Sequence, residues 1–176
     1  ARITVYLTGS IAAYKGVEVV RGLQKKGHQV RTVMTTAASR LVTPTTLAAL
    51  TKQTVLTSLW ENTDPIPHIE LADWTELALV VPASADILAK MATGLADDAA
   101  STTLLATSAP KVVVPAMNSH MWQTPATQRN LRQLQSDGVT VISPVDGILA
   151  EGYAGKGRMP EPAAIVDQVH TLLTSS

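Results

Sequence analysis

The sequence predicts an α/β fold with a doubly wound parallel sheet, and three observations support this fold class. Short β-branched runs alternate along the chain with helical stretches, which is typical of βαβ units around a parallel sheet. The runs are apolar at nearly every position, as expected of strands that helices cover on both faces. The length of 176 residues suits one domain. We therefore expect residues 1–176 to form a single three-layer sandwich of the Rossmann or flavodoxin-like type.

The first part of the chain is expected to contain two strands and three helices. The strands are the β-branched runs Ile3–Leu7 and Gln29–Met34. A helix is expected over Ile11–Lys26, because its apolar residues recur at helical spacing and Gly27 follows as a typical C-terminal glycine. Two short helices are expected to follow, over Thr36–Leu41 and Pro44–Leu50.

The second part is expected to alternate in the same way, after a loop over Trp60–Pro67 that is rich in Asn, Asp and Pro. Strands are expected at Leu77–Val81, Lys111–Val114 and Val139–Ile142, and a proline ends each of the first two. Helices are expected over Asp86–Met91, Asp98–Ala106, Thr124–Ser136 and Pro162–Leu173. Before the last helix, Asp146–Met159 holds four glycines and is expected to form a long loop.

Composition and charge exclude several classes of protein. The 14 basic and 14 acidic residues balance, so the charge excess that favours nucleic acid or an anionic membrane as a partner is absent. Only 16% of residues are charged and 45% are hydrophobic, a composition opposite to that of disordered chains. No apolar run reaches the roughly 18 residues of a membrane helix, and the first residues lack the pattern of a signal peptide. We therefore expect a folded protein with no membrane or nucleic-acid partner.

The absence of cysteine limits the chemistry of the chain. Without Cys, the chain can form no disulfide, bind no metal through thiolates and use no thiol nucleophile. His and carboxylate residues do not occur at metal-ligand spacings such as HExxH, so we expect no metal site. A chain without cysteine also fits a cytoplasmic location, which we expect here.

Small, hydroxyl and amide residues follow four of the expected strands, at places where turns are ordinarily charged. In open α/β sheets, ligands bind beyond the carboxyl ends of the strands. We therefore expect one binding site to be formed by four segments, Thr8–Ala13, Thr35–Ser39, Pro82–Asp86 and Pro115–Trp122.

Gly9 and Ser10 precede the first expected helix. Backbone N–H groups at a helix start, together with a Ser hydroxyl, suit a phosphate group, but Ser is also a common N-cap residue. At this position alone the two explanations are equal, because the segment matches neither the GxGxxG nor the GxxxxGK[ST] motif. The hydroxyl groups of Thr35, Ser39 and Ser84 favour a phosphate, since a mononucleotide offers many acceptors to hydroxyl donors.

Of the four histidines, His68 is the candidate for chemistry. It follows Pro65-Ile66-Pro67 at the expected start of a helix, and imidazole is the commonest acid–base group near neutral pH. By itself, a histidine at such a junction is more often a cap or a surface residue. His28 and His170 are expected to be surface residues, and His120 is ambiguous because it lies in the turn after Asn118.

The segment Pro115–Asn118, followed by Met121 and Trp122, is the most specific pattern in the chain. An Asn side chain both donates and accepts hydrogen bonds, and two Met and one Trp would place an apolar wall beside it. The alternative is that Asn118 caps a helix while the Met and Trp side chains belong to the core.

The glycine-punctuated segment Gly147–Met159 has the length of a lid over a site. Within it, Arg158 or Lys156 could pair with a phosphate or a carboxylate. The alternative is a surface hairpin without a function.

Taken together, these segments resemble the homo-oligomeric flavin-containing cysteine decarboxylases. The family includes the decarboxylases of coenzyme A synthesis and the peptidyl-cysteine decarboxylases of lantibiotic synthesis. The resemblance covers about Arg2–Pro162, and its Pro-Ala-Met-Asn-x-x-Met-Trp string is highly specific. The strings that carry it are Gly9-Ser10-Ile11-Ala12-Ala13-Tyr14-Lys15, His68-Ile69-Glu70-Leu71, Pro82-Ala83-Ser84-Ala85-Asp86, Pro115-Ala116-Met117-Asn118 with Met121-Trp122, and Gly157-Arg158-Met159.

The resemblance implies FMN as the cofactor and assigns roles to particular residues. The FMN phosphate is implied near Gly9, Ser10 and Ile11. The other expected cofactor contacts are Thr35, Ala37, Ser39, Ser84, Ala85, Asp86, Ile87 and Ala116. His68 is implied to be the essential histidine, and the loop of about residues 146–160 to be a substrate clamp. The expected substrate contacts are Asn118, which would bind the substrate carboxylate, together with Met117, Ile148, Ala150, Arg158 and Met159.

The implied reaction is the FMN-dependent decarboxylation of 4′-phosphopantothenoylcysteine to 4′-phosphopantetheine in coenzyme A biosynthesis. Glu151 stands where the enzymes of this branch commonly carry a Cys proton donor, so Glu151 becomes the candidate donor. The alternatives are an oxidative peptidyl-cysteine decarboxylase of the lantibiotic type and a non-catalytic flavin-binding regulatory subunit. The Gly-x-Gly-Arg-Met ending of the clamp favours the coenzyme A branch.

The resemblance also implies an assembly. Family members form homo-trimers or dodecamers of trimers, and they build the site between subunits. The 176 residues leave no room for a fused synthetase domain, so a synthetase would be a separate partner chain.

Overall fold

The computed structural model describes residues 1–60, 66–148, 152 and 154–175. Within these residues, five parallel strands form the main sheet in the order β2-β1-β3-β4-β5. Their bounds are Arg2–Leu7 (β1), Gln29–Met34 (β2), Leu77–Ala83 (β3), Lys111–Pro115 (β4) and Thr140–Val141 (β5). This strand order is the flavodoxin-like one, so the predicted doubly wound parallel fold is confirmed.

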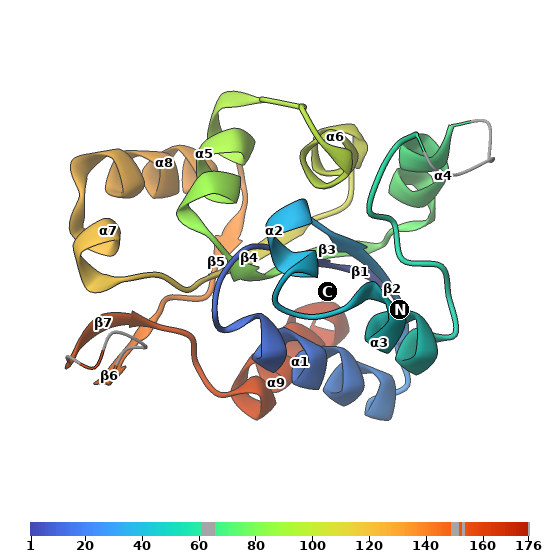
Figure 1. The fold of residues 1–176 in the computed structure, drawn as a ribbon, viewed down its shortest axis with the longest axis horizontal. Helices are drawn as coiled ribbons and strands as arrows, with labels where there is room; N and C mark the ends of the chain where they lie inside the picture. The colour runs from blue at the N-terminus through green and yellow to red at the C-terminus, as the bar shows by residue number, and fades with distance from the viewer. Residues whose placement is uncertain (61–65, 149–151, 153, 176) are drawn as a thin grey trace.

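Helices cover both faces of the sheet and give the molecule three layers (Figure 1). One face carries α1 (Ala13–Lys25), α3 (Pro44–Thr51) and α9 (Pro162–Thr174). The other face carries α4 (Pro67–Trp74), α5 (Ala85–Thr93), α6 (Ala99–Ala106) and α8 (Pro125–Ser136). Two short helices, α2 (Thr36–Ser39) and α7 (Ser119–Gln123), follow β2 and the loop after β4. None of the described helices has both the length and the apolar character needed to cross a membrane.

Successive residues of β1 face opposite sides of the sheet, which explains its continuous apolar sequence. Val5 and Leu7 belong to a buried cluster that includes residues of α1 and α9. Tyr6 belongs to a second buried cluster, which includes residues of α5, α6 and α8. Burial raises the pKa of Tyr6, so its phenol stays neutral inside the core.

Strand β3 continues through Pro82 to Ala83, whereas the sequence predicts an end at Val81. Proline has no N–H to donate, and the register between β3 and β4 shifts between Val80 and Ala83. Pairing then resumes where the Ala116 N–H donates to the Ala83 carbonyl oxygen at 3.1 Å. The shifted register lets β3 continue to the carboxyl edge of the sheet.

The glycine-rich segment is an antiparallel hairpin of β6 (Val145–Ile148) and β7 (Ala154–Arg158), which corrects the predicted long loop. A second difference is that α7 precedes α8, where the sequence predicts one helix that starts at Thr124. The two helices are separate because Thr124 ends α7, accepts a hydrogen bond from the Thr127 N–H as the cap of α8, and is followed by Pro125. The hairpin and α4 lie toward opposite ends of the long axis of the molecule (Figure 1).

Candidate active site

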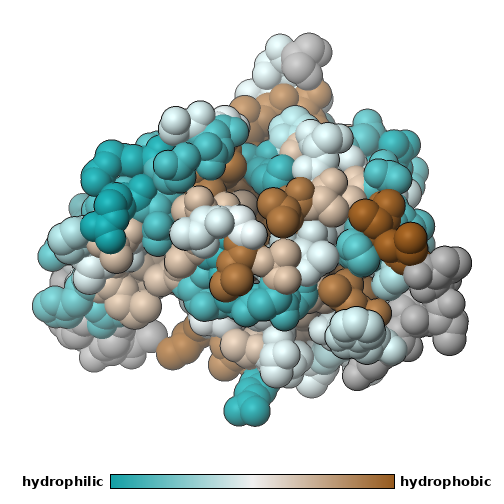
Figure 2. All heavy atoms as spheres, turned by 90° about the horizontal axis from the view of Figure 1, so that it is seen from above, coloured by the Kyte–Doolittle hydropathy of each residue, from teal (hydrophilic) through white to brown (hydrophobic). Residues whose placement is uncertain are grey.

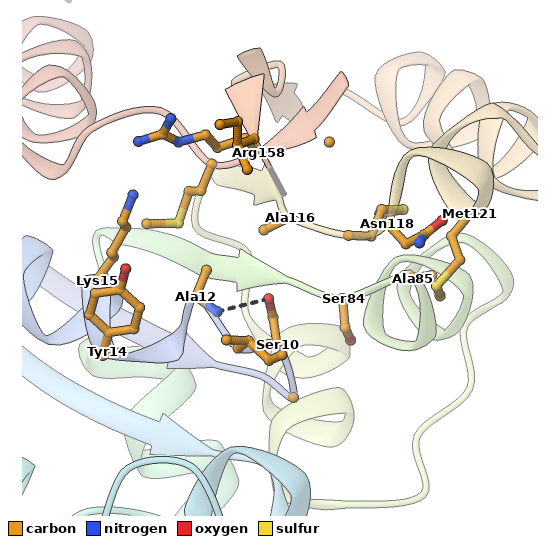
Figure 3. Close-up of a pocket in the computed structure, with 16 residues that line it drawn as sticks. Ser10, Ala12, Tyr14, Lys15, Ser84, Ala85, Ala116, Asn118, Met121 and Arg158 are labelled. Carbon is orange, nitrogen blue, oxygen red and sulfur yellow. Dashed lines mark hydrogen bonds between the residues drawn. The ribbon is translucent and has the colours of Figure 1, made fainter. Parts of the chain in front are cut away.

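A pocket of about 600 Å³ opens at the carboxyl ends of β1, β3 and β4, below the β6–β7 hairpin (Figure 3). A cavity of this volume is in the range of small-molecule and cofactor sites. With the strand order 2-1-3-4-5, the chain crosses from one half of the sheet to the other between β1 and β3, which is where ligands bind in open α/β sheets.

Thr8 joins the ends of β1 and β3 below the pocket. Its hydroxyl donates to the Pro82 carbonyl oxygen at 2.6 Å and accepts from the Ser84 N–H at 2.9 Å. The side chain is fully buried, and both of its hydrogen-bonding roles are satisfied. Thr8 thereby fixes the position of Ser84 relative to the loop that carries Ser10. The signal in the sequence is a hydroxyl residue at the end of an apolar strand.

Ser10 and Ser84 both line the pocket, and each hydroxyl accepts a backbone hydrogen bond, Ser84 as the N-cap of α5 and Ser10 in the turn before α1. The Ser10 hydroxyl oxygen accepts from the Ala12 N–H at 3.2 Å, and the Ser84 hydroxyl oxygen accepts from the Ile87 N–H at 3.2 Å. Neither hydroxyl donates a hydrogen bond to another described residue. Ser84 can therefore cap α5 and still donate to a ligand. Ser10 is not the cap of α1, whose N-cap residue is Ala12, and its hydroxyl can also donate to a ligand.

The loop after β4 places Asn118 in the pocket wall. The Met117 N–H donates to the Gly157 carbonyl oxygen at 3.0 Å, which ties this loop to the hairpin. The Asn118 side-chain oxygen accepts from the His120 N–H at 2.7 Å and so caps α7. Met121 is half-exposed and lines the pocket, whereas Trp122 packs on the core. Asn118 is thus both a cap and a wall residue.

Two cations face the pocket from the side opposite Asn118 (Figure 3). Lys15 and Arg158 are the charged residues among the described ones that line it. Both contact the same carboxylate: Glu161 Oε1 lies 3.7 Å from Lys15 Nζ and accepts from Arg158 Nη2 at 3.1 Å. The shared carboxylate leaves this end of the pocket with a net positive charge, which suits an anionic ligand.

Glycines let the hairpin approach the body of the protein. Gly157 has a φ of +147°, and a Cβ there would overlap the Met117 carbonyl oxygen. Gly147 lies against the Arg158 side chain, whose Cδ atom would be 2.8 Å from a Cβ at position 147. The absence of these two side chains lets β7 contact the Asn118 loop and lets Arg158 lie across β6.

Most of the predicted site residues line this pocket, together with several others that were not named individually as site residues. The predicted ones that line it are Gly9, Ser10, Ile11, Ser84, Ala85, Ala116, Met117, Asn118, Ile148, Arg158 and Met159. The additional ones are Ala12, Tyr14, Lys15, Met121 and Gly157. All five lie in the strings that carry the family resemblance, and Ala12 and Met121 also lie in the segments that were expected to form the site. The strings could therefore have indicated these residues, but only the residues beside them were named as contacts.

Five predicted cofactor contacts are not among the residues that line the pocket in one chain. Thr35 caps α2, and the Ser39 hydroxyl donates within α2 to the Thr36 carbonyl oxygen. Ala37 lies directly against Gly9, since a Cβ on Gly9 would be 2.6 Å from the Ala37 Cβ. On α5, Asp86 pairs with Lys90 at 3.2 Å, and Ile87 is buried in the core.

His68 lies on α4, outside the residues that line the pocket. Its Nδ1 atom is buried and has no hydrogen-bond partner in the described part of the chain. Ala150 and Glu151, the other predicted clamp residues, lie outside the described residues. Within those residues, no group of three His, Cys, Asp or Glu side chains could hold a metal ion.

His28 and His170, which were expected to be surface residues, contact each other. Their Nε2 and Nδ1 atoms are 2.9 Å apart. Burial, the N-terminal ammonium and His170 together lower the pKa of His28, so the neutral form of the His28 ring is favoured. It joins the turn after α1 to α9 and lies away from the pocket.

Comparison with known proteins gives consistent matches. A family model described as Flavoprotein matches residues 1–174. The coenzyme A biosynthesis bifunctional protein CoaBC of Bacillus subtilis is 43% identical over 166 residues, which cover 93% of this chain and 41% of that protein. The chain therefore spans 41% of the length of this curated relative.

Two solved structures are similar over nearly the whole chain. One is a variant PPC decarboxylase in complex with pantothenoylaminoethenethiol, with a TM-score of 0.86, 33% identity and coverage of 99% of this chain and 98% of that one. The other is the FMN-dependent cysteine decarboxylase SpaF, with a TM-score of 0.83, 32% identity and coverage of 99% and 98%.

Proposed function

This chain belongs to the flavoprotein family, and we propose that it is an FMN-dependent decarboxylase that converts 4′-phosphopantothenoylcysteine to 4′-phosphopantetheine in coenzyme A biosynthesis. The observation that carries the proposal is the arrangement of the pocket. Asn118 lies on one side, and Lys15 and Arg158 lie on the other (Figure 3). This substrate carries a carboxylate at one end and a phosphate at the other, so the amide and the two cations match its two anionic groups.

The residues of the pocket fit FMN as the cofactor. The small side chains of Gly9, Ala85 and Ala116 leave room for a flat ring system, and the hydroxyls of Ser10 and Ser84 can donate to phosphate or ring acceptors. Bound FMN supplies a hydride acceptor, which allows the substrate thiol carbon to be oxidised to a thiocarbonyl.

The chain's own residues position the substrate for loss of carbon dioxide. Decarboxylation of an ordinary cysteine carboxylate would leave an unstabilised carbanion, whereas a thiocarbonyl β to the carboxylate accepts the electron pair. Asn118 holds the carboxylate in the pocket wall, and Lys15 and Arg158 hold the phosphate. The β6–β7 hairpin covers the pocket and limits the access of water.

The site is completed by His68 from a second copy of the chain. His68 lies outside the pocket of its own chain, on a helix toward the other end of the molecule (Figure 1). Exposed apolar side chains occur near both places: Ile11, Tyr14 and Ile148 line the pocket, and Ile66 and Ile69 adjoin His68. Such groups are typical of surfaces that another chain covers. We place the protein in a homo-trimer or a dodecamer of trimers, in which His68 manages a proton in the neighbouring pocket.

The proposal includes a cellular location and a partner for the enzyme. We place it in the cytoplasm, where coenzyme A synthesis would supply its substrate. A synthetase that makes this substrate is the proposed partner, either on the same polypeptide or on a separate one, since the CoaBC relative is described as bifunctional.

Incubation of the FMN-loaded protein with phosphopantothenoylcysteine, followed by mass spectrometry, tests the proposal. Release of carbon dioxide with formation of phosphopantetheine is the expected result. A product lighter by two hydrogens would assign the chain to the oxidative branch, and no release would favour a non-catalytic flavin-binding subunit. The variant Glu151→Gln, run in parallel, tests the proton donor: accumulation of the lighter product in the variant alone supports Glu151.

A further inference from the structure

Arg31 on β2 contacts α4 through two kinds of interaction. Its Nη1 and Nη2 atoms donate to the two carboxylate oxygens of Glu70, at 2.9 and 3.1 Å. Its Cζ atom lies 5.1 Å from the centre of the Trp74 ring, within the range of a cation–π contact. A single exposed ion pair contributes little to stability, but a bidentate pair on an aromatic face fixes the direction of both partners.

The helical periodicity places these contacts and His68 on different sides of α4. Glu70 and Trp74 are four residues apart and share one side of α4. His68 is two residues before Glu70, so its side chain leaves the helix on roughly the opposite side, together with the buried residues Leu71 and Ala72. Rotation of α4 about its axis would therefore change the direction of His68.

Within the described part of the chain, the other side-chain hydrogen bonds to α4 are near its C-terminal end. The Thr107 hydroxyl donates to the Ala72 carbonyl oxygen at 3.1 Å, and Arg2 Nε donates to the Trp74 carbonyl oxygen at 2.7 Å. At the first turn, the N-cap residue Ile66 provides no side-chain hydrogen bond. Among the described residues, the Arg31–Glu70 pair is thus the side-chain ion pair nearest to His68.

We propose that Arg31 is a positioning residue for His68: by holding Glu70 at two points and Trp74 by its ring, it sets the rotation of the first turns of α4 and so directs the imidazole toward the pocket of the neighbouring copy. The inference rests on the role of His68 in the proposed function. A lysine could keep the charge but not the two parallel hydrogen bonds, because an ammonium lacks the planar fork of a guanidinium.

The test compares Arg31→Lys and Glu70→Gln with the wild-type FMN-loaded enzyme. Displacement of an acid–base group by a fraction of an ångström is expected to lower kcat about tenfold, while KM and FMN content stay unchanged because neither residue lines the pocket. A second readout is independent of turnover. The rate at which diethyl pyrocarbonate acylates His68, mapped by peptide mass spectrometry, is expected to rise in both variants.

Two further variants control for a loss of stability. The double variant Arg31→Glu with Glu70→Arg restores an ion pair between β2 and α4 but not the contact with the Trp74 ring, and it is expected to recover part of the lost kcat. Lys26→Gln removes another surface pair, Lys26 with Asp167 at 3.7 Å, and is expected to change neither readout.

The inference is overturned if Arg31→Lys and Glu70→Gln keep the wild-type kcat and acylation rate while His68→Asn has no turnover. The proposed function would remain intact in that case. A lower melting temperature with unchanged kcat would also overturn the inference, because the pair would then only stabilise the fold. Full turnover in His68→Asn would instead refute the proposed role of His68, and the inference would fall with it.

Discussion

The Asn118 side chain accepts a hydrogen bond from the His120 N–H and also faces the pocket, so two roles must be separated in any test. Asn118→Asp separates them because Asp is an equally good N-cap residue and would keep α7 in place. Its carboxylate would repel the carboxylate of the substrate. We expect turnover to fall about 100-fold or more while FMN remains bound, as measured by carbon dioxide release and flavin absorbance.

The matched control is Gln123→Glu, which adds the same charge to an exposed position of the same short helix, outside the pocket. It is expected to behave as wild type. Full activity of Asn118→Asp would remove Asn118 from the carboxylate site.

Arg158 is expected to distinguish phosphorylated from unphosphorylated substrates. A hydrogen bond between charged groups contributes about 1.5–3 kcal/mol, so Arg158→Gln should raise KM for phosphopantothenoylcysteine about tenfold or more. KM for pantothenoylcysteine, which lacks the phosphate, should change little. Steady-state kinetics with both substrates give the comparison.

Lys156→Gln provides the control, because Lys156 is on the same strand but is exposed and does not line the pocket. An equal rise of KM for both substrates in Arg158→Gln would place the phosphate elsewhere.

The pocket residues that directly follow a strand could be predicted from the sequence. Ser10, Ser84 and Ala116 follow three different strands, and the carboxyl ends of parallel strands converge at one edge of the sheet. Lys15 was not identified because it lies inside α1, beyond the segment that directly follows the strand. The position of His68 could not be derived from strand ends at all, since it lies on the helix that precedes β3.

The β6–β7 hairpin depends on close contact of its backbone with the Asn118 loop. At Gly157, a φ of +147° and the proximity of the Met117 carbonyl oxygen both exclude a side chain. Gly157→Ala is therefore expected to push β7 away from the loop, at a cost of about 1–3 kcal/mol in local stability. KM should rise, and the hairpin amides should exchange faster in hydrogen–deuterium exchange, while the core strands keep their protection.

Gly27→Ala is a comparison variant with a positive φ of +91° but no atom within 4 Å of the added Cβ. It should share the backbone strain but leave KM unchanged. If Gly157→Ala has wild-type KM and hairpin exchange, the contact between β7 and the Asn118 loop is not required for the site.

The regular elements were predictable where residue type and tertiary position agree. The strands β1 and β2 are β-branched runs, and their predicted and observed bounds agree within one residue. The hairpin was missed because β7 consists of Ala, Gly, Lys, Gly and Arg, none of which favours a strand, and its pairing with β6 supplies the structure instead. β3 was predicted too short because a proline ordinarily ends a strand, and only the shifted register permits it to continue.

The molecule as a single chain exposes apolar surface in several places, and Figure 2 shows brown apolar patches separated by polar surface on one face. Two groups of exposed residues matter for the site: one lines the pocket, and the other flanks the first turn of α4. Because the two groups are different surfaces of the chain, their contact would be head-to-tail, and such contacts close into rings when the rotation permits. A ring of this kind would bring His68 of each chain to the pocket of the next.

This arrangement predicts that two inactive variants can complement each other. His68→Asn lacks the histidine but keeps its own pocket, and Asn118→Asp keeps the histidine but has a defective pocket. Suppose that each site takes His68 from one chain and Asn118 from its neighbour. A site in a mixed ring is then intact where an Asn118→Asp chain supplies His68 to the pocket of a His68→Asn chain. With equal amounts and random assembly, about a quarter of the sites are expected to be intact.

Co-expression of the two variants with different affinity tags, followed by purification through both tags, isolates the mixed assemblies. Carbon dioxide release is then compared with that of the wild type and of each variant alone. Each mixed trimer contains one intact site of three, so about a third of the wild-type rate is the expected result for doubly purified trimers, and about a quarter for dodecamers of randomly assembled trimers. A mixture of the two variants purified separately should stay inactive until subunits exchange. If mixed assemblies form but show no activity, each site takes both residues from one chain. In that case α4 would have to approach the pocket of its own chain, although α4 and the pocket lie apart in the fold (Figure 1). Failure to isolate any doubly tagged assembly, with a monomer found by ultracentrifugation, would refute the shared site directly, because a single chain does not bring His68 to the residues that line its pocket.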